Sequence, residues 1–135
     1  MDKTIVTFPD PNLEDVIRKA IDKPEGAIST SDLESFTVLN APDRGITDLT
    51  GLEYCVNLQT LSLTGNNISD ISALAGLSNL VVLSLGSNNI SDISPLAGLS
   101  NLKWLDLAGN SVSDFSVLPF KFDQDGRFIW LANRK

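Results

Sequence analysis

The chain has no histidine and a single cysteine, Cys55, among its 135 residues. An intramolecular disulfide is therefore excluded, as are Cys/His metal sites and acid–base chemistry that depends on imidazole. Cys55 falls where the corresponding positions hold leucine, and its neighbours Glu53 and Tyr54 supply no positive charge that would stabilise a thiolate. We expect Cys55 to be a small buried apolar residue rather than a reactive thiol.

Positive charge is also scarce. The formal net charge is −7, and no Lys or Arg occurs between Arg44 and Lys103. Nucleic acids and anionic membranes are therefore not expected as partners, because phosphate binding needs clustered basic residues. No apolar run reaches the roughly 18 residues that indicate a membrane span. The sequence also shows no paired-carboxylate pocket, so we expect no enzyme, no cofactor and no metal.

What the sequence does contain is a repeat. Residues 58–79 read LQTLSLTGNNISDISALAGLSN, and residues 80–101 read LVVLSLGSNNISDISPLAGLSN. The pattern L-x-x-L-x-L-x-x-N-x-I is typical of a leucine-rich repeat. The eight matching positions are Leu58, Leu61, Leu63, Asn66, Ile68, Ile71, Leu74 and Leu77, then Leu80, Leu83, Leu85, Asn88, Ile90, Ile93, Leu96 and Leu99.

The same period extends in both directions. Residues 36–57 form a degenerate first repeat with Arg44 in place of the asparagine, and a fourth repeat runs from residue 102 to about 123. The predicted fold is an α/β solenoid, a right-handed leucine-rich-repeat superhelix with a parallel concave β-sheet and short helical or 3-10 turns on the convex side. We expect one domain, 1–135, with a helical N-terminal cap at 1–35, four repeats at 36–123 and a C-terminal cap at 124–135.

The two ends are predicted to cover the open core. Asp10 and Pro11 have the composition of a helix start, Pro24 and Gly26 mark its end, and the apolar stripe between them is Leu13, Val16, Ile17, Ala20 and Ile21. Glu14 with Arg18, and Asp15 with Lys19, have the spacing of stabilising pairs. The segment from Ser31 to Glu34 predicts a capping box that opens a second short helix. At the other end we expect a strand at 126–133, with either Phe128 and Trp130 or Ile129 and Leu131 facing inward.

Three stretches resemble the internalin type of bacterial leucine-rich-repeat protein: FPDPNLEDVIRKAIDKPEG, GITDLTGLEYCVNL and the NNISDIS-x-L-A-G-L-SNL units. The resemblance covers roughly residues 5 to 118 and includes the helical cap. Internalins and their relatives are extracellular binding proteins, and some engage host receptors through the concave sheet. The resemblance therefore implies a secreted or cell-surface protein, although residues 1–8 are too short for a signal peptide.

The strand pattern also predicts the binding surface. Residues between the inward leucines point outward, and strands about 4.8 Å apart stack them into rows. We call the surface formed by these rows the concave face. The predicted protein-binding residues are those of its two central rows: Val38, Thr60, Val82 and Trp104, then Asn40, Ser62, Ser84 and Asp106.

Two features of these repeats have competing interpretations. Trp104 has the side chain of a binding hot spot, but an indole that lies over Val82 or over the C-terminal cap would only shield the sheet. Asp48, Asp70, Asp92 and Asp114 recur every 22 residues. A row of carboxylates is a possible calcium ligand set, but a cap on each following turn explains the same spacing and is favoured.

The favoured function is a non-catalytic protein-binding module that presents a rigid concave face to a protein partner, as a monomer or a weak homodimer. The alternative is a structural cap-and-repeat fragment, or an engineered, consensus-like scaffold without a ligand of its own. The near-identity of the two middle repeats is compatible with the second reading.

Overall fold

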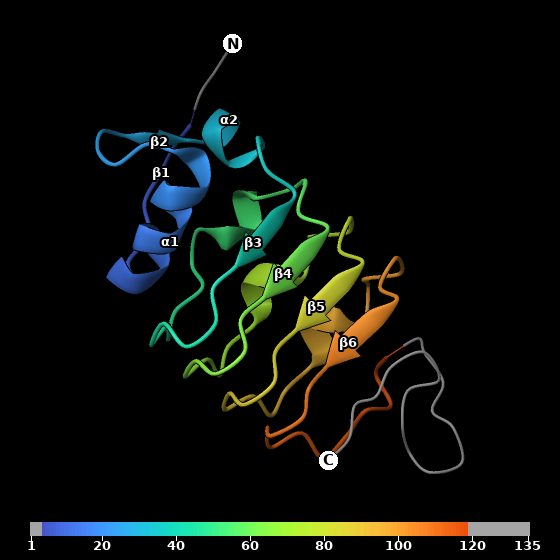
Figure 1. The fold of residues 1–135 in the computed structure, drawn as a ribbon. Helices are drawn as coiled ribbons and strands as arrows, with labels where there is room; N and C mark the ends of the chain where they lie inside the picture. The colour runs from blue at the N-terminus through green and yellow to red at the C-terminus, as the bar shows by residue number, and fades with distance from the viewer. Residues whose placement is uncertain (1–3, 119–135) are drawn as a thin grey trace.

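The computed structural model describes residues 4–118, and its centre is a parallel sheet of four short strands in the order β3-β4-β5-β6 (Figure 1). Val38 pairs with Thr60, Thr60 with Val82, and Val82 with Trp104. Each repeat therefore contributes one rung in the predicted register. The strands are β3 (Val38–Asn40), β4 (Thr60–Ser62), β5 (Val82–Ser84) and β6 (Trp104–Asp106).

The middle residue of every strand is a buried leucine, and the residues on either side of it point outward. This alternation follows from the two-residue period of an extended chain. After each strand a second apolar residue enters the core, and the chain then turns: Ala41 follows β3, and leucines follow the other three strands. The inward leucines Leu39, Leu61, Leu83 and Leu105 are all at most 2% exposed.

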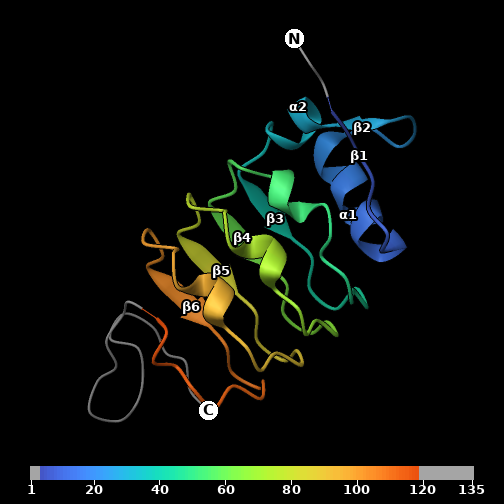
Figure 2. The ribbon, with the colours of Figure 1, turned by 180° about the vertical axis from the view of Figure 1, so that it is seen from behind.

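Short 3-10 helices lie behind the sheet and return the chain to the next strand (Figure 2). They are η1 (Leu52–Tyr54), η2 (Ser72–Leu74) and η3 (Ser94–Leu96). In the second repeat, Ile68, Ile71, Leu74 and Leu77 are at most 1% exposed, as are their equivalents in the third. Sheet and turns therefore enclose one continuous apolar core, which the repeat pattern predicted.

A ladder of asparagines holds the turns that follow the strands, as predicted. The Asn66 side-chain oxygen accepts hydrogen bonds from the N–H groups of Arg44 and Ile46, while its amide nitrogen donates to the carbonyls of Ala41 and Leu63. Asn88 and Asn110 repeat the arrangement by accepting from Ile68 and Ile90. Each asparagine thus satisfies backbone groups of its own repeat and of the preceding one, which a buried turn requires.

The structure reveals a second asparagine ladder that the sequence analysis missed. Asn57, Asn79 and Asn101 stand just before the strands, and each donates to a carbonyl 23 residues earlier, those of Glu34, Val56 and Ser78. These bonds are exposed, whereas Asn66 is buried. These asparagines recur every 22 residues, so the sequence alone could have predicted this second ladder.

Helix α1 (Pro11–Ile21) lies beyond β3 at the N-terminal end of the solenoid (Figure 1). It begins as predicted: the Asp10 side chain accepts from the N–H groups of Asn12 and Leu13, and Pro11 is the first helical residue. The ion pairs Arg18–Glu14 and Lys19–Asp15 form at 2.8 and 3.2 Å. Leu13, Val16 and Ile17 are buried, so this stripe closes the core.

Two details of α1 differ from the prediction. Ala20 is exposed, because the buried stripe narrows after Ile17 and only Ile21 beyond it packs partly against the core. The helix also ends earlier than Pro24. Asp22 adopts a left-handed conformation with φ of 55°, and the Lys23 N–H bonds to the Arg18 carbonyl, which closes the last turn.

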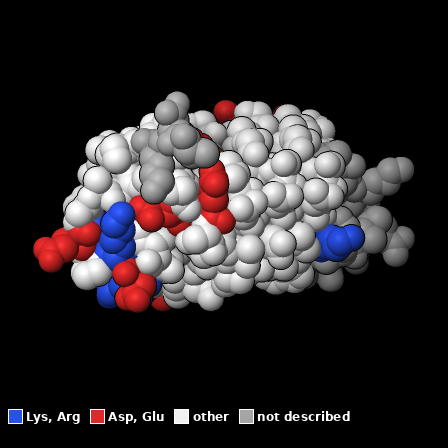
Figure 3. All heavy atoms as spheres, turned by 90° about the horizontal axis from the view of Figure 1, so that it is seen from above, with Lys and Arg blue, Asp and Glu red and all other residues white. Residues whose placement is uncertain are grey.

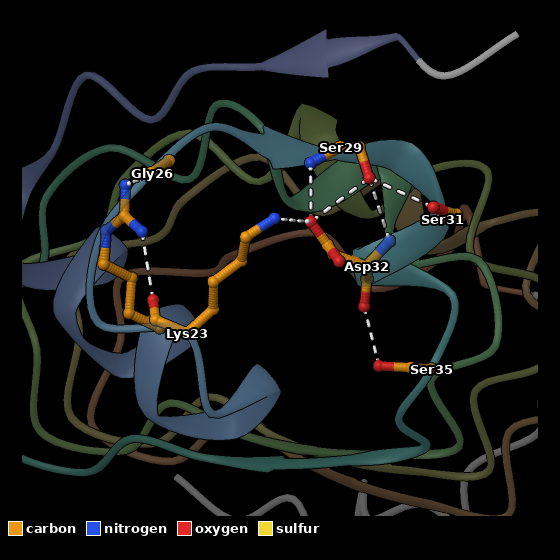
Figure 4. Close-up of polar contacts among 7 residues, drawn as sticks. Lys23, Gly26, Ser29, Ser31, Asp32 and Ser35 are labelled. Carbon is orange, nitrogen blue, oxygen red and sulfur yellow. Dashed lines mark hydrogen bonds and ion pairs between the residues drawn. The ribbon is translucent and has the colours of Figure 1, made fainter.

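The capping box of the second helix is displaced from its predicted position. Helix α2 (Thr30–Leu33) starts two residues earlier, with Ser29 as the capping residue and Asp32 as its partner (Figure 4). Asp32 also binds the Lys23 ammonium at 3.0 Å. The shift arises because Ser29 is held extended by strand pairing: β2 (Ile28–Ser29) pairs antiparallel with β1 (Ile5–Val6), a two-stranded sheet that the analysis did not predict.

The predicted strand at 126–133 and the C-terminal cap at 124–135 lie outside the described residues. The two alternative registers of that strand stay predictions, as does the single-domain boundary at residue 135.

Candidate functional site: the concave sheet face

The first predicted row of the concave face forms an unbroken outward ladder across the four strands. Val38 is 50% exposed and Trp104 is 40% exposed, while Thr60 and Val82 between them are partly exposed. The pairing places Trp104 beside Val82 on the next strand. An apolar row with an accessible indole at one end is therefore held on the sheet surface.

The second predicted row is polar. Asn40 is exposed, and Ser62, Ser84 and Asp106 are partly exposed. Asp106 also has a local role, because one carboxylate oxygen accepts from the Ala108 N–H at 3.0 Å and shapes the turn after β6. The two rows together offer apolar contact along one line and hydrogen-bonding groups along its neighbour.

The outward side chains stand on a closely packed base. Each lies next to a leucine that is nearly or fully buried, and each strand is bonded to its neighbours in constant register. Neighbouring strands are separated by about 4.8 Å, so the spacing of the rows is fixed by the backbone. A surface of this kind is ordered before any partner binds.

The charge on the molecule is unevenly distributed. Figure 3 shows Lys and Arg side chains towards the two ends of the face in view. Asp and Glu side chains lie beside the left-hand group, and a broad uncharged surface separates them from the right-hand group. Among residues 4–118, the ion pairs use Arg18, Lys19 and Lys23, which leaves Arg44 and Lys103 outside them. Both are exposed, one at each end of the repeat array.

The convex aspartates act as turn caps. Asp48, Asp70, Asp92 and Asp114 accept from the N–H groups of Thr50, Ser72, Ser94 and Ser116, each two residues further on. The bond from the Ser72 N–H lowers the pKa of Asp70, and the Ser94 N–H does the same for Asp92. Each carboxylate therefore has its own local partner, and within the described range no three such side chains gather around one point.

Cys55 lies where the sequence analysis placed it, fully buried at a leucine position of the core. Burial raises the pKa of its thiol to about 12, and the nearby Glu53 carboxylate adds to the effect. The thiol is therefore protonated at neutral pH, and Cys55 is a packing residue.

A shallow hollow between α1 and β3 was not predicted from the sequence. It measures about 230 Å³ and is lined by Val16, Lys19, Ala20, Val38, Leu39, Asn40 and Arg44. It joins the N-terminal end of the concave face, since Val38 and Asn40 belong to the two central rows. No sequence motif predicts such a hollow, because it depends on how far α1 stands from the first strand.

Within residues 4–118, no helix is both long and apolar enough to cross a bilayer.

Comparison with known proteins shows which of them share this architecture. The family described as Leucine rich repeat matches residues 56–112. An internalin of Listeria monocytogenes, InlF, is similar with a TM-score of 0.78 and 38% sequence identity over 82% of this chain and 33% of that one. A leucine-rich-repeat protein of Leptospira interrogans is similar with a TM-score of 0.57 and 28% identity, over 62% of this chain and 22% of that one.

A structure of Clostridium perfringens ZmpB that contains its CBM51-2 and INT domains shares the fold, with a TM-score of 0.60 and 24% identity over 100% of this chain and 30% of that one. The chain thus spans a third or less of the length of each of these structures. No curated protein sequence matches it.

Proposed function

Since the chain is an internalin-like leucine-rich-repeat protein, we propose that it is a non-catalytic module that binds a protein partner through its concave face. The observation that carries the proposal is the in-register outward row of Val38, Thr60, Val82 and Trp104 above a fully packed core. The proposed contact residues are the two central rows: Val38, Asn40, Thr60, Ser62, Val82, Ser84, Trp104 and Asp106.

The physical mechanism is rigid presentation. Binding costs conformational entropy when loops and side chains must become ordered, and a preformed surface avoids most of that cost. The two central strands are hydrogen-bonded to a neighbour on each side, and the two edge strands to one neighbour. The outward side chains have few rotatable bonds. Trp104 adds a large amphipathic surface, and exposed aromatic residues are enriched among the residues that dominate binding energy.

The polar row supplies specificity in this proposal. Asn40, Ser62 and Ser84 can donate and accept hydrogen bonds, and a partner that leaves them unpaired on contact would lose affinity. The central part of the face carries no cation, so recognition there depends on shape and hydrogen bonds rather than on positive charge.

A matched pair of valines tests the proposal. Val82→Asp places a charge in the centre of the concave face, and Val56→Asp makes the same change at a valine that is 43% exposed but lies outside the sheet. Immobilised wild-type and variant proteins are used to capture partners from extracts and from host-cell surface preparations, with quantitative mass spectrometry as the readout. We expect Val82→Asp to lose partners that Val56→Asp retains.

The alternative, a structural segment without its own ligand, predicts a different result. In that case neither variant changes the set of captured proteins, and captured proteins do not bind the purified chain in a direct titration. Retention of every wild-type partner by Val82→Asp would therefore contradict the assignment of the concave face.

A further inference from the structure

We propose that the hollow between α1 and β3 receives a carboxylate of the partner, with Arg44 as the residue that binds it. This inference rests on the proposed function, since the hollow continues the concave face through Val38 and Asn40. It specifies which side chains of the partner contact this end of the concave face, namely an Asp or Glu next to an apolar residue.

The first support comes from the repeat itself. Where later repeats have Asn66, Asn88 and Asn110, which are buried or partly buried, the first repeat has Arg44. Those asparagines bond to the turn of the preceding repeat, as Asn66 does to Ala41 and Ile46. The first repeat has α1 before it and not another turn, so position 44 has no such turn to hold. Its side chain is exposed and is released from the structural role of the ladder.

The second support is that the Arg44 charge is unpaired. Within residues 4–118, the ion pairs involve Arg18, Lys19 and Lys23. In the same part of the chain, Arg44 donates a hydrogen bond from its backbone N–H to the Asn66 side chain, and its guanidinium takes no part in that bond. The neighbouring Asp43 is not part of the hollow, because its carboxylate lies over Gly65 in the next repeat, where it would collide with any Cβ.

The third support is the shape of the hollow. Val16, Ala20 and Val38 give it apolar walls, and Arg44 lies at its border, with Asn40 as a neutral hydrogen-bonding group. At about 230 Å³ it is smaller than the sites of drug-sized ligands, so it fits one or two side chains of a partner.

Carboxylate is the group that this arrangement favours. A guanidinium offers a planar fork of N–H donors that matches a carboxylate in two parallel bonds. Lys19 also borders the hollow, but its ammonium is already paired with Asp15 at 3.2 Å. The net charge of −7 opposes polyanions, whereas a single acidic side chain on a protein segment needs only one free cation.

The test uses a phage library of random dodecapeptides selected against the wild-type chain, followed by anisotropy titrations of the enriched peptides. We expect these peptides to share an Asp or Glu beside an apolar residue. Arg44→Gln should raise their Kd about tenfold or more, as expected for a lost charged hydrogen bond, and Arg44→Lys should raise it less. Exchange of the peptide acid for its amide should remove the difference between wild type and Arg44→Gln.

Lys103→Gln is the matched control, because it removes one exposed, unpaired charge at the other end of the array. Its Kd should stay within about threefold of wild type. Equal weakening by Lys103→Gln and Arg44→Gln would show general attraction between charges and would overturn the inference. The inference would also be overturned if exchange of the peptide's acidic side chain for its amide left the Kd for the wild-type chain unchanged.

The outcomes separate this inference from the proposed function. Peptides that lose binding with Val82→Asp but bind Arg44→Gln as well as wild type would contradict the role of Arg44 and leave the concave face in place. Peptides that bind all of these variants equally, or a selection that enriches no peptide, would contradict both.

Discussion

At the scale of single residues, the asparagines that follow the strands are central to the stability of the fold. Asn66 alone bonds to five backbone groups, of which three belong to the preceding repeat. A leucine provides apolar contact from any suitable rotamer, but only an amide of this length both donates and accepts in so small a turn. The ladder therefore fixes the position of one repeat on the next.

We predict that Asn66→Ala lowers the free energy of unfolding by about 2–4 kcal/mol, because it leaves several buried N–H and C=O groups without partners. Asn79→Ala is the control: it removes one exposed bond to the Val56 carbonyl and should cost less than about 1 kcal/mol. Urea unfolding followed by circular dichroism measures both. Equal losses for the two variants would mean that burial of the amide is not what matters.

At the scale of elements, Asp10 joins the cap to the repeats. One oxygen of its carboxylate caps α1, and the other accepts from the N–H groups of Thr47 and Asp48 in the first repeat. Burial, the largest influence, raises the pKa of Asp10, but the four backbone N–H groups outweigh it, so the pKa is lowered overall. The charged form of Asp10 is therefore the form that stabilises the cap.

The sign of the pH dependence follows from that shift. A carboxyl with a lower pKa in the folded state binds its proton more weakly there than in the unfolded chain. The free energy of unfolding should therefore fall as the pH is lowered from about 5 through the folded pKa of Asp10. Asp32, Asp70 and Asp92, with their lowered pKa values, act in the same direction.

We predict that Asp10→Asn is less stable than wild type at pH 7 and loses less stability on acidification, because one of the titrating groups is gone. Urea unfolding at intervals between pH 3 and 7 gives both quantities. Asp15→Asn, at a position where the carboxylate is 60% exposed, should follow the wild-type curve. A curve for Asp10→Asn that runs parallel to wild type would rule out the coupling of Asp10 ionisation to folding.

The elements also show what could be predicted from the sequence. The rungs were predictable because a period of 22 residues fixes which leucine faces inward, and Leu61, Leu83 and Leu105 obey it. The capping box was misplaced because Ser29 is held by pairing with β1, and two-residue strands have no period to detect. The end of α1 at Asp22 was missed for a similar reason, since one left-handed residue closed the helix before Pro24.

At the scale of the whole molecule, the repeat architecture positions the candidate site. The outward rows were predictable, since every residue in them is adjacent in sequence to a buried leucine, and the structure places all eight residues on one face of the sheet. The hollow beside Arg44 was not predictable, because it depends on the distance between α1 and β3. The repeat period thus determines the central surface, whereas the packing of α1 against the first repeat determines its N-terminal border.

The account depends most directly on Trp104, and calorimetric titration of a captured partner tests it. Trp104 and Tyr54 are both 40% exposed, but Trp104 lies on the concave face and Tyr54 lies on the convex helix η1. We predict that Trp104→Ala weakens binding by about 2 kcal/mol, close to a thirtyfold rise in Kd, and that Tyr54→Ala leaves it within about twofold of wild type. An unchanged Kd for Trp104→Ala, or a larger loss for Tyr54→Ala, would contradict the concave-face account.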